Sequence, residues 1–427
     1  MPDKEKVLIR SIPHYDPSRI RDLIKDGIQE LGLDTLIRGR ITIKPNVVMA
    51  HHIVAPSAYT RSEFMDGLIS ALQETGQPDQ EITIAEKCGA GIPTSRMFRR
   101  AGYNRFKKSH RIKLVPIEEA KKKTIPLEKG KIHKKLTTAR VIAENDFLVY
   151  APKLKSNVLS QGLTGSIKLN VGILLDRERM WQHNFNLEEK IVDLLEVGLP
   201  DLIVTDGIEM SYGGNQLTQH GFPTGIIVMA SNPVAHDTVC AQILNLIPQE
   251  IRHIRLAHER GYGPIAMEDI DLISDVPLEE LQSRTSGLDL GYRNVRDVDC
   301  NLKILNGSPY CTGGCHGVFL DWLYMIKDRK PHLWKKMPEW TVVIGKYDGD
   351  VEAKRIIKIG TCTKIKGKLK TKRKIHIKGC PPRHKDFVLF LFLKAGIINP
   401  LFRLDLILDS YLFLFLSWCR RLLRGRL

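Results

Sequence analysis

Residues 147–155 read Phe-Leu-Val-Tyr-Ala-Pro-Lys-Leu-Lys, an apolar run that ends in a turn-former and two lysines. A similar arrangement occurs at 41–46, Ile-Thr-Ile-Lys-Pro-Asn, and at 82–86, Ile-Thr-Ile-Ala-Glu. Amphipathic stretches lie between these runs, and apolar strands that alternate with helices are typical of a parallel sheet covered by helices. The sequence therefore predicts an α/β fold with a mainly parallel, helix-covered sheet.

The same pattern extends over the first 260 residues. Strands are expected at 7–12, 41–44, 81–85, 112–115, 147–151, 202–205 and 225–230. Helices are expected at 18–31, 62–74, 187–197 and 234–246.

The remainder of the chain has a different character. After residue 300 the sequence predicts an apolar helix at 317–327 and strands at 341–344, 355–359 and 374–378. We therefore expect three parts. These are an α/β body at 1–300, a smaller α+β cysteine-bearing module at 301–385, and an apolar, Arg-rich helical tail at 386–427.

Charged residues follow several of the expected strands, and ligand sites in parallel sheets gather at the carboxyl ends of strands. A Gly/Ser/Thr-rich loop at 161–172 adds Lys168 and backbone amides that could cradle an anion. We expect the lysines to hold an anionic small molecule, and Glu86 or Asp206 to act as acid–base groups. Solvated strand ends and a non-catalytic anion-binding site are the alternatives. The candidate residues are Lys44, Glu86, Lys153, Lys155, Lys168, Asp206 and Asp237.

Four cysteines after residue 300 lie within two positions of a glycine. Cys311 and Cys315 precede the helix at 317–327, and Cys362 and Cys380 stand where two strands are expected to end. Glycine lets the backbone approach a cofactor and direct N–H groups at sulfur. Structural zinc sites usually contain two closely spaced ligand pairs. This chain has one such pair, Cys311 and Cys315, and two single cysteines, Cys362 and Cys380. The spacing favours a [4Fe–4S] cluster, with zinc or unrelated buried thiols as alternatives.

With these residues in view, the chain resembles the uncharacterised family catalogued as domain of unknown function 362. The resemblance implies an iron–sulfur protein, because members are often described as such, and some carry a ferredoxin-like domain that this chain lacks. Gly379-Cys-Pro-Pro382 is similar to a loop in the cluster-bearing small subunits of hydrogenases and respiratory NADH dehydrogenases, which favours iron–sulfur over zinc. The matching stretches are 43–46, 84–86, 151–155, 165–172, His183, 204–207 and 231–237.

The net charge of +17 is concentrated in two segments. Residues 99–140 carry 15 basic and 3 acidic side chains, and residues 352–385 carry 13 basic and 1 acidic. The second segment holds two of the four cysteines, so it is expected to be a docking face for an acidic redox partner. Nucleic acid is a less favoured partner, because the segment has no interleaved aromatic residues for base stacking. A solvated basic hairpin is the alternative, and the segment at 99–140 has no assigned role.

The cysteine content is too low for a disulfide scaffold, and the first residues contain no signal-peptide pattern. We therefore expect a cytoplasmic protein. The tail at 401–427 predicts a helix packed on the body or on a partner subunit, with an amphipathic helix on a membrane surface as the less favoured alternative. The function is expected to be redox-linked, as in an iron–sulfur oxidoreductase. The alternative is a non-catalytic anion- or nucleic-acid-binding module with a structural zinc.

Overall fold

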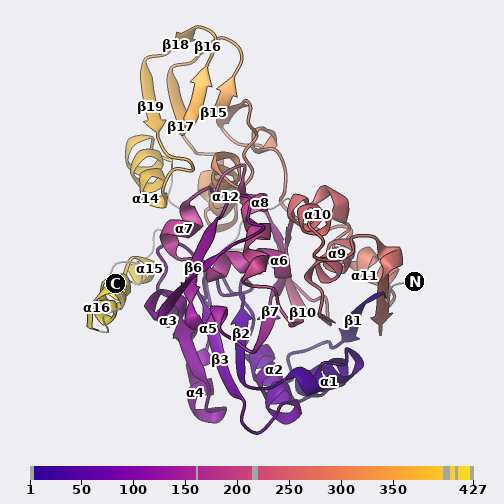
Figure 1. Cartoon of the computed structure of the whole chain (residues 1–427). Coiled ribbons are helices and arrows are strands. Elements are labelled where there is room, and N and C mark those ends of the chain that lie inside the picture. Colours follow the sequence, from indigo (N-terminus) through magenta and orange to yellow (C-terminus); the bar gives the residue numbers. More distant parts are fainter. Residues whose placement is uncertain (1–3, 160–161, 214–219, 398–403, 409–411, 424–427) are drawn as a thin grey trace.

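A computed structural model describes residues 4–159, 162–213, 220–397, 404–408 and 412–423. A large mixed sheet forms the body, and a smaller parallel sheet projects from one end of it (Figure 1). The predicted fold class, a mainly parallel helix-covered sheet with a smaller C-terminal cysteine-bearing sheet, is confirmed.

The large sheet contains all seven strands predicted for the body. Five strands pair in parallel: β10 (Leu202–Tyr212), β7 (Phe147–Ala151), β2 (Arg40–Pro45), β3 (Glu81–Glu86) and β4 (Lys113–Pro116). Strand β12 (Ile226–Ala230) runs antiparallel to both β1 (Glu5–Ser11) and β10. Three further strands extend this sheet: β8 (Lys153–Asn157), β9 (Gly162–Thr164) and β11 (His220–Phe222). The main order is β13 (Ile270–Ser274), β1, β12, β10, β7, β2, β3 and β4.

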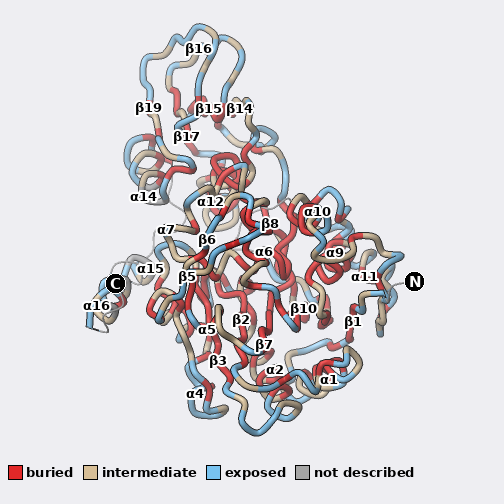
Figure 2. Tube along the Cα trace, in the orientation of Figure 1, coloured by how far each residue is buried: buried red, intermediate tan, exposed pale blue. Residues whose placement is uncertain are grey.

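Both faces of the sheet are covered, which explains why its strands are continuous apolar runs. In β1, Val7 and Ile9 pack into one core and Leu8 packs into the other. Figure 2 shows the buried strands between the covering helices. Helices α1 (Pro17–Glu30) and α2 (Ser62–Thr75) lie on one face, and α6 (Ser166–Leu169), α8 (Leu187–Asp193), α9 (Pro233–Ile243) and α10 (Arg252–Glu259) lie on the other.

The smaller sheet has four parallel strands in the order β14 (Leu302–Asn306), β15 (Trp340–Tyr347), β17 (Arg355–Ile365) and β19 (Arg373–Ile377). Helix α12 (Cys315–Arg329) joins this sheet to the body, because its apolar residues belong to the same core as β1 and α9. The short pair β16 (Val351–Glu352) and β18 (Leu369–Lys370) forms the tip.

The expected end of a strand before Cys362 is wrong. Strand β17 continues through this residue, with an irregularity where Ile344 pairs with Ile359 and Lys346 pairs with Lys364. Gly345 of β15 therefore stands opposite residues 360–363 of β17, and this longer segment bulges out of the ladder. The bulge gives Cys362 an exposed position although it lies within the strand.

The C-terminal segment is helical where it is described. It comprises α14 (His384–Phe387), a π-helix at Val388–Lys394, α15 (Leu404–Leu408) and α16 (Leu414–Leu423). Within the described part of the chain, no helix has the length and apolar character needed to cross a membrane.

Candidate functional site

A cavity of about 220 Å³ lies at the carboxyl ends of β2 and β3, where the sheet rule predicts a ligand site. It is closed by β8, by the segment 164–172 and by α12. Four of the seven candidate residues line it: Lys44, Glu86, Lys155 and Lys168.

A buried ion pair forms one wall of the cavity. Lys44 at the end of β2 donates to Glu86 at the end of β3, with 2.8 Å between Nζ and Oε2. Burial raises the pKa of Glu86 to about 7, although the Lys44 charge opposes the shift. Gly172 lies directly against the pair, and a Cβ at this position would clash with both charged groups. A carboxyl group with a pKa near neutrality is suited to proton transfer at physiological pH.

Two other lysines in the cavity have no ion-pair partner among the described residues. The Lys155 ammonium is fully enclosed and lacks a hydrogen-bond acceptor there. Burial lowers the pKa of Lys155 to about 8 and that of Lys168 to about 7, and for Lys168 the charges of Lys155 and Arg179 add to the shift. The carboxylate of Asp321 opposes the pKa shift of both lysines, and that of Glu188 opposes the shift of Lys168. Neither carboxylate forms a salt bridge with a cavity lysine in the described part of the chain, and buried cations without a close anion are costly.

Sequence reasoning missed three cations that shape the cavity. Lys87 follows Glu86 directly and pairs with Asp176 at 2.9 Å. The Arg179 guanidinium donates to the carbonyls of Lys87 and Cys88 at 2.6 and 2.5 Å, and thus anchors the loop after β3. Lys190 donates to three carbonyls in the segment 178–181, including that of Arg179 at 2.8 Å. The adjacency of Lys87 to Glu86 was the only signal in the sequence for any of them.

Asp237 does not line the cavity. Its carboxylate accepts hydrogen bonds from the backbone N–H groups of Ser166 and Ile167, at 2.7 and 3.0 Å, and from His236. These amides open α6, so the expected anion cradle at 161–172 is already filled by a protein carboxylate. Residue 161 lies outside the described residues. Asp237 is therefore a positioning residue for the helix that carries Lys168.

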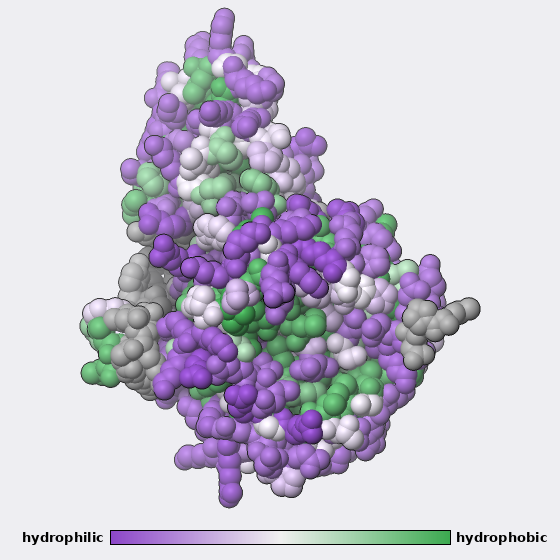
Figure 3. Space-filling model, in the orientation of Figure 1, coloured by the Kyte–Doolittle hydropathy of each residue, from purple (hydrophilic) through white to green (hydrophobic). Residues whose placement is uncertain are grey.

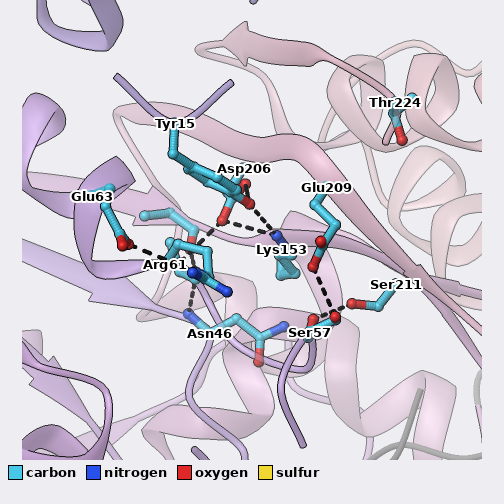
Figure 4. A network of polar contacts seen from close by, with 12 residues as sticks. Tyr15, Asn46, Ser57, Arg61, Glu63, Lys153, Asp206, Glu209, Ser211 and Thr224 are labelled. Carbon is cyan, nitrogen blue, oxygen red and sulfur yellow. Dashed lines mark hydrogen bonds and ion pairs between the residues drawn. The ribbon is translucent and has the colours of Figure 1, made fainter. Parts of the chain in front are cut away.

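Lys153 and Asp206 form a separate buried network, drawn in Figure 4. Their side chains are 3.1 Å apart, and both bond to the Tyr15 hydroxyl, at 2.7 Å from Lys153 and 2.9 Å from Asp206. Asp206 also accepts the backbone N–H of Arg61, and burial together with Asp206 raises the pKa of Tyr15. Lys153 and Asp206 thus find their hydrogen-bond partners inside this network, and neither of them lines the cavity.

Strand register explains why Lys153 and Lys155 separate. Strand β8 pairs Lys153 with Asp206 and Lys155 with Ser211 of β10, with an irregularity between the two positions. Between these two pairs, Leu154 of β8 thus faces residues 207–210 of β10, so lysines that share a strand face reach different surroundings.

The four candidate cysteines come together beside the cavity. Cys311 and Cys315 are buried at the start of α12, whereas Cys362 and Cys380 are exposed in the β17 bulge and after β19. A Cβ on Gly360 would lie 2.7 Å from the Cys315 sulfur, which places the bulge against α12.

The sulfur atoms are close enough to influence one another electrostatically. Burial raises the pKa of Cys311 to about 12, and the charges of Cys380 and Cys362 add to the rise. The pKa of Cys315 is raised by burial and by the other three thiols. Backbone N–H groups of Gly314 and Cys315 oppose the shift by bonding to the Cys311 sulfur. N–H groups directed at sulfur are the usual surroundings of thiolates that bind iron–sulfur clusters.

The segment 183–184 connects the cavity with the cysteines. His183 lines the cavity, and its Nδ1 donates to the Gly313 carbonyl at 2.6 Å, inside the loop between Cys311 and Cys315. The next residue, Asn184, donates its amide to the Cys380 sulfur at 3.4 Å. The cavity and the four-cysteine cluster are therefore adjacent sites that share one short segment.

Across the described ranges, no group of three or more His, Cys, Asp or Glu side chains could hold one ion.

No curated protein matches this sequence. Among solved structures, the lactate racemase apoprotein from Thermoanaerobacterium thermosaccharolyticum is 13% identical, and the match covers 58% of this chain and 58% of that one, with a TM-score of 0.36. A protein from Thermotoga maritima is 11% identical over 77% of this chain and 70% of that one, with a TM-score of 0.32. Residues 41–242, which contain every cavity-lining candidate, are a domain of the family described as Domain of unknown function (DUF362).

Proposed function

We propose that this chain is a redox-linked iron–sulfur protein that binds an anionic small molecule. Cys311, Cys315, Cys362 and Cys380 would hold a [4Fe–4S] cluster, and the lysine-lined cavity would take the anion. The observation that carries the proposal is the segment 183–184, which contacts the cysteine loop and Cys380 while it lines the cavity.

The donor set fits a cluster better than a single zinc ion. Zinc needs four ligands about 2.3 Å from one centre, and no such group occurs among the described residues. A cluster is a larger object, so its thiolates stand further apart while remaining electrostatic neighbours. N–H groups directed at Cys311 and the Asn184 amide at Cys380 are donors that stabilise cluster thiolates.

The cavity supplies binding and proton transfer. Lys155 and Lys168 would bind the anion. The Lys155 ammonium has no hydrogen-bond partner among the residues described, and burial lowers the pKa of both lysines although Asp321 opposes the shift. Glu86, held by Lys44 and with a pKa of about 7, would accept or donate a proton at its carboxylate. When bound, the cluster would supply one electron at a time to or from a molecule in the cavity.

The basic segment at 352–385 favours an acidic protein as the redox partner. It includes the exposed Lys364, Lys368, Lys372 and Lys374, around the strands that carry Cys362 and precede Cys380. A negatively charged redox protein would be attracted to this surface, and its binding would weaken as salt is added. Salt-independent binding of such a partner would contradict this part of the proposal.

Anaerobic purification with iron, sulfide and zinc analysis tests the cluster. We expect about four irons and four sulfides per chain, as in a [4Fe–4S] centre. Cys362→Ser should lose most of this iron, whereas the control Cys300→Ser should retain it, because Cys300 lies outside the four-cysteine set. A colourless protein with stoichiometric zinc would refute the assignment.

A second measurement separates a redox enzyme from a simple binding module. Because the two sites adjoin, an anion bound in the cavity should lower the reduction potential of the cluster. The shift should disappear in Lys168→Gln and persist in the exposed-lysine control Lys107→Gln. If sulfate binds without shifting the potential, the cavity and the cysteines are not coupled, and the redox-linked proposal is wrong.

A further inference from the structure

Helix α16 has an unusual orientation on the protein. Ser417 is 3% exposed and donates to Glu119 at 2.8 Å, and Arg420 bonds to both Glu119 oxygens, at 2.8 and 3.1 Å. Arg420 also reaches Ser95 at 2.9 Å. The polar side of the helix thus faces the body, whereas an amphipathic helix on a soluble protein normally buries its apolar side.

The apolar side of α16 faces outward as a result. Phe415 is 57% exposed, Trp418 44% and Leu423 87%. The short helix α15 repeats the pattern, because its Asp405 bonds inward to His51 at 2.8 Å. Figure 3 shows hydrophobic side chains of this region beside hydrophilic surface. The exposed apolar residues include Leu404 and Leu408 of α15, Leu412 just before α16, and Phe415, Trp418 and Leu423 of α16.

The elements that α16 contacts belong to a basic part of the chain. Helix α16 contacts α3 (Thr94–Arg100) through Ser95 and the 3₁₀ helix η3 (Ile117–Glu119) through Glu119. Helix α3 runs into the segment 99–140 and η3 lies inside it. This segment has a net charge of +12, and none of its residues lines the cavity. Arg99 on α3 is exposed, and three consecutive lysines at 121–123 follow Glu119 closely.

We propose that α15, α16 and the adjoining basic segment bind the surface of an anionic lipid membrane. Outward apolar side chains would enter the interface, and the lysines and arginines would contact anionic headgroups. A second copy of the chain fits less well, because pairing these surfaces would bring two segments of like charge together. This inference does not depend on the cluster or on the anion cavity.

Sedimentation with lipid vesicles tests the inference on the full chain. We expect binding to vesicles of phosphatidylcholine with about 30% phosphatidylserine, weaker binding at high salt, and little binding to phosphatidylcholine alone. The double variant Phe415→Glu, Trp418→Glu should lower the partition coefficient by at least about tenfold. Both positions are exposed, so its melting temperature should match that of the wild type. The control Ile247→Glu, at an exposed apolar position after α9, should bind like the wild type.

Charge is tested separately by Arg99→Gln, which should weaken binding to the anionic vesicles and leave binding to phosphatidylcholine unchanged. The inference is overturned if the wild type does not bind anionic vesicles, or if the double variant binds as well as the wild type does. It is also overturned if light scattering reveals a dimer that the double variant abolishes while vesicle binding is absent.

Discussion

The two unpartnered cavity lysines predict a steep pH dependence for anion binding. Burial lowers the pKa of Lys168 to about 7 and that of Lys155 to about 8 in the free protein. A bound anion favours the charged ammonium of each lysine, so binding raises both pKa values and takes up protons. The affinity is therefore highest below pH 7 and decreases as the pH rises through both values.

The magnitude follows from these pKa values. If both lysines are charged in the complex, raising the pH from 6 to 9 costs a factor of about 100 from Lys168 and about 10 from Lys155, or about a thousandfold in all. At pH 8 about nine tenths of Lys168 and half of Lys155 are neutral, so binding should take up about 1.4 protons.

Isothermal titration calorimetry with sulfate provides the assay, because sulfate keeps its charge over this pH range. Titrations in buffers of different ionisation enthalpy give the number of protons taken up. Lys168→Met should weaken binding and leave a decrease of about tenfold, from Lys155 alone. The control Lys107→Met, at an exposed position on α4 (Phe106–Ser109), should follow the wild type. A wild-type affinity that is constant from pH 6 to 9, without proton uptake, would refute the reasoning.

Three further variants test the positioning of the sites. Asp237→Ala removes the acceptor for two α6 amides and should lower the free energy of unfolding by about 3 kcal/mol in a denaturant titration. Since hydrogen bonds lower the pKa of Asp237 overall despite its burial, this contribution is present at neutral pH and is lost as the solution becomes acidic. Gly360→Ala places a methyl group 2.7 Å from the Cys315 sulfur at a φ of +94°, so the iron content of the purified protein should fall. Arg420→Ala removes the bonds that hold α16 on η3, so limited proteolysis should release the C-terminal segment faster.

Each of these variants has a matched control that should behave like the wild type. Asp269→Ala is the control for Asp237→Ala, and Arg19→Ala is the control for Arg420→Ala. Gly287→Ala is the control for Gly360→Ala, because a Cβ at position 287 would meet open space. The structural roles are contradicted if a variant and its control give the same unfolding free energy, iron content or cleavage rate.

Much of the fold could be predicted from local sequence. Runs such as 147–151 and 202–205 are apolar and bounded by turn-formers, and both appear as strands buried on two faces. The short strands β5 (Lys122–Pro126) and β6 (Lys135–Ala139) were not predicted, because their lysine-rich sequences give no apolar pattern. They pair with each other and lie outside the large sheet.

Some residues of the candidate site could be predicted from the sequence, and others could not. Lys44 and Glu86 could be predicted because each ends a parallel strand, and neighbouring parallel strands end at one edge. Lys190 and Arg179 could not, because their hydrogen bonds go to carbonyls that become neighbours only in the folded chain. The role of Asp237 also depends on a long-range contact, because this residue lies on α9 and bonds to α6, 71 positions earlier in the chain.

The sequence by itself determined the α/β class, the positions of most strands, the glycine-flanked cysteines and the two basic segments. These properties depend on residues that are neighbours in the chain, through apolar periodicity, turn chemistry and composition. The tertiary structure alone decided that Lys155 enters the cavity while Lys153 pairs with Asp206, because an irregular strand register separates them. It also brought the four cysteines against the cavity and turned the apolar side of α16 outward, since both depend on contacts between distant segments.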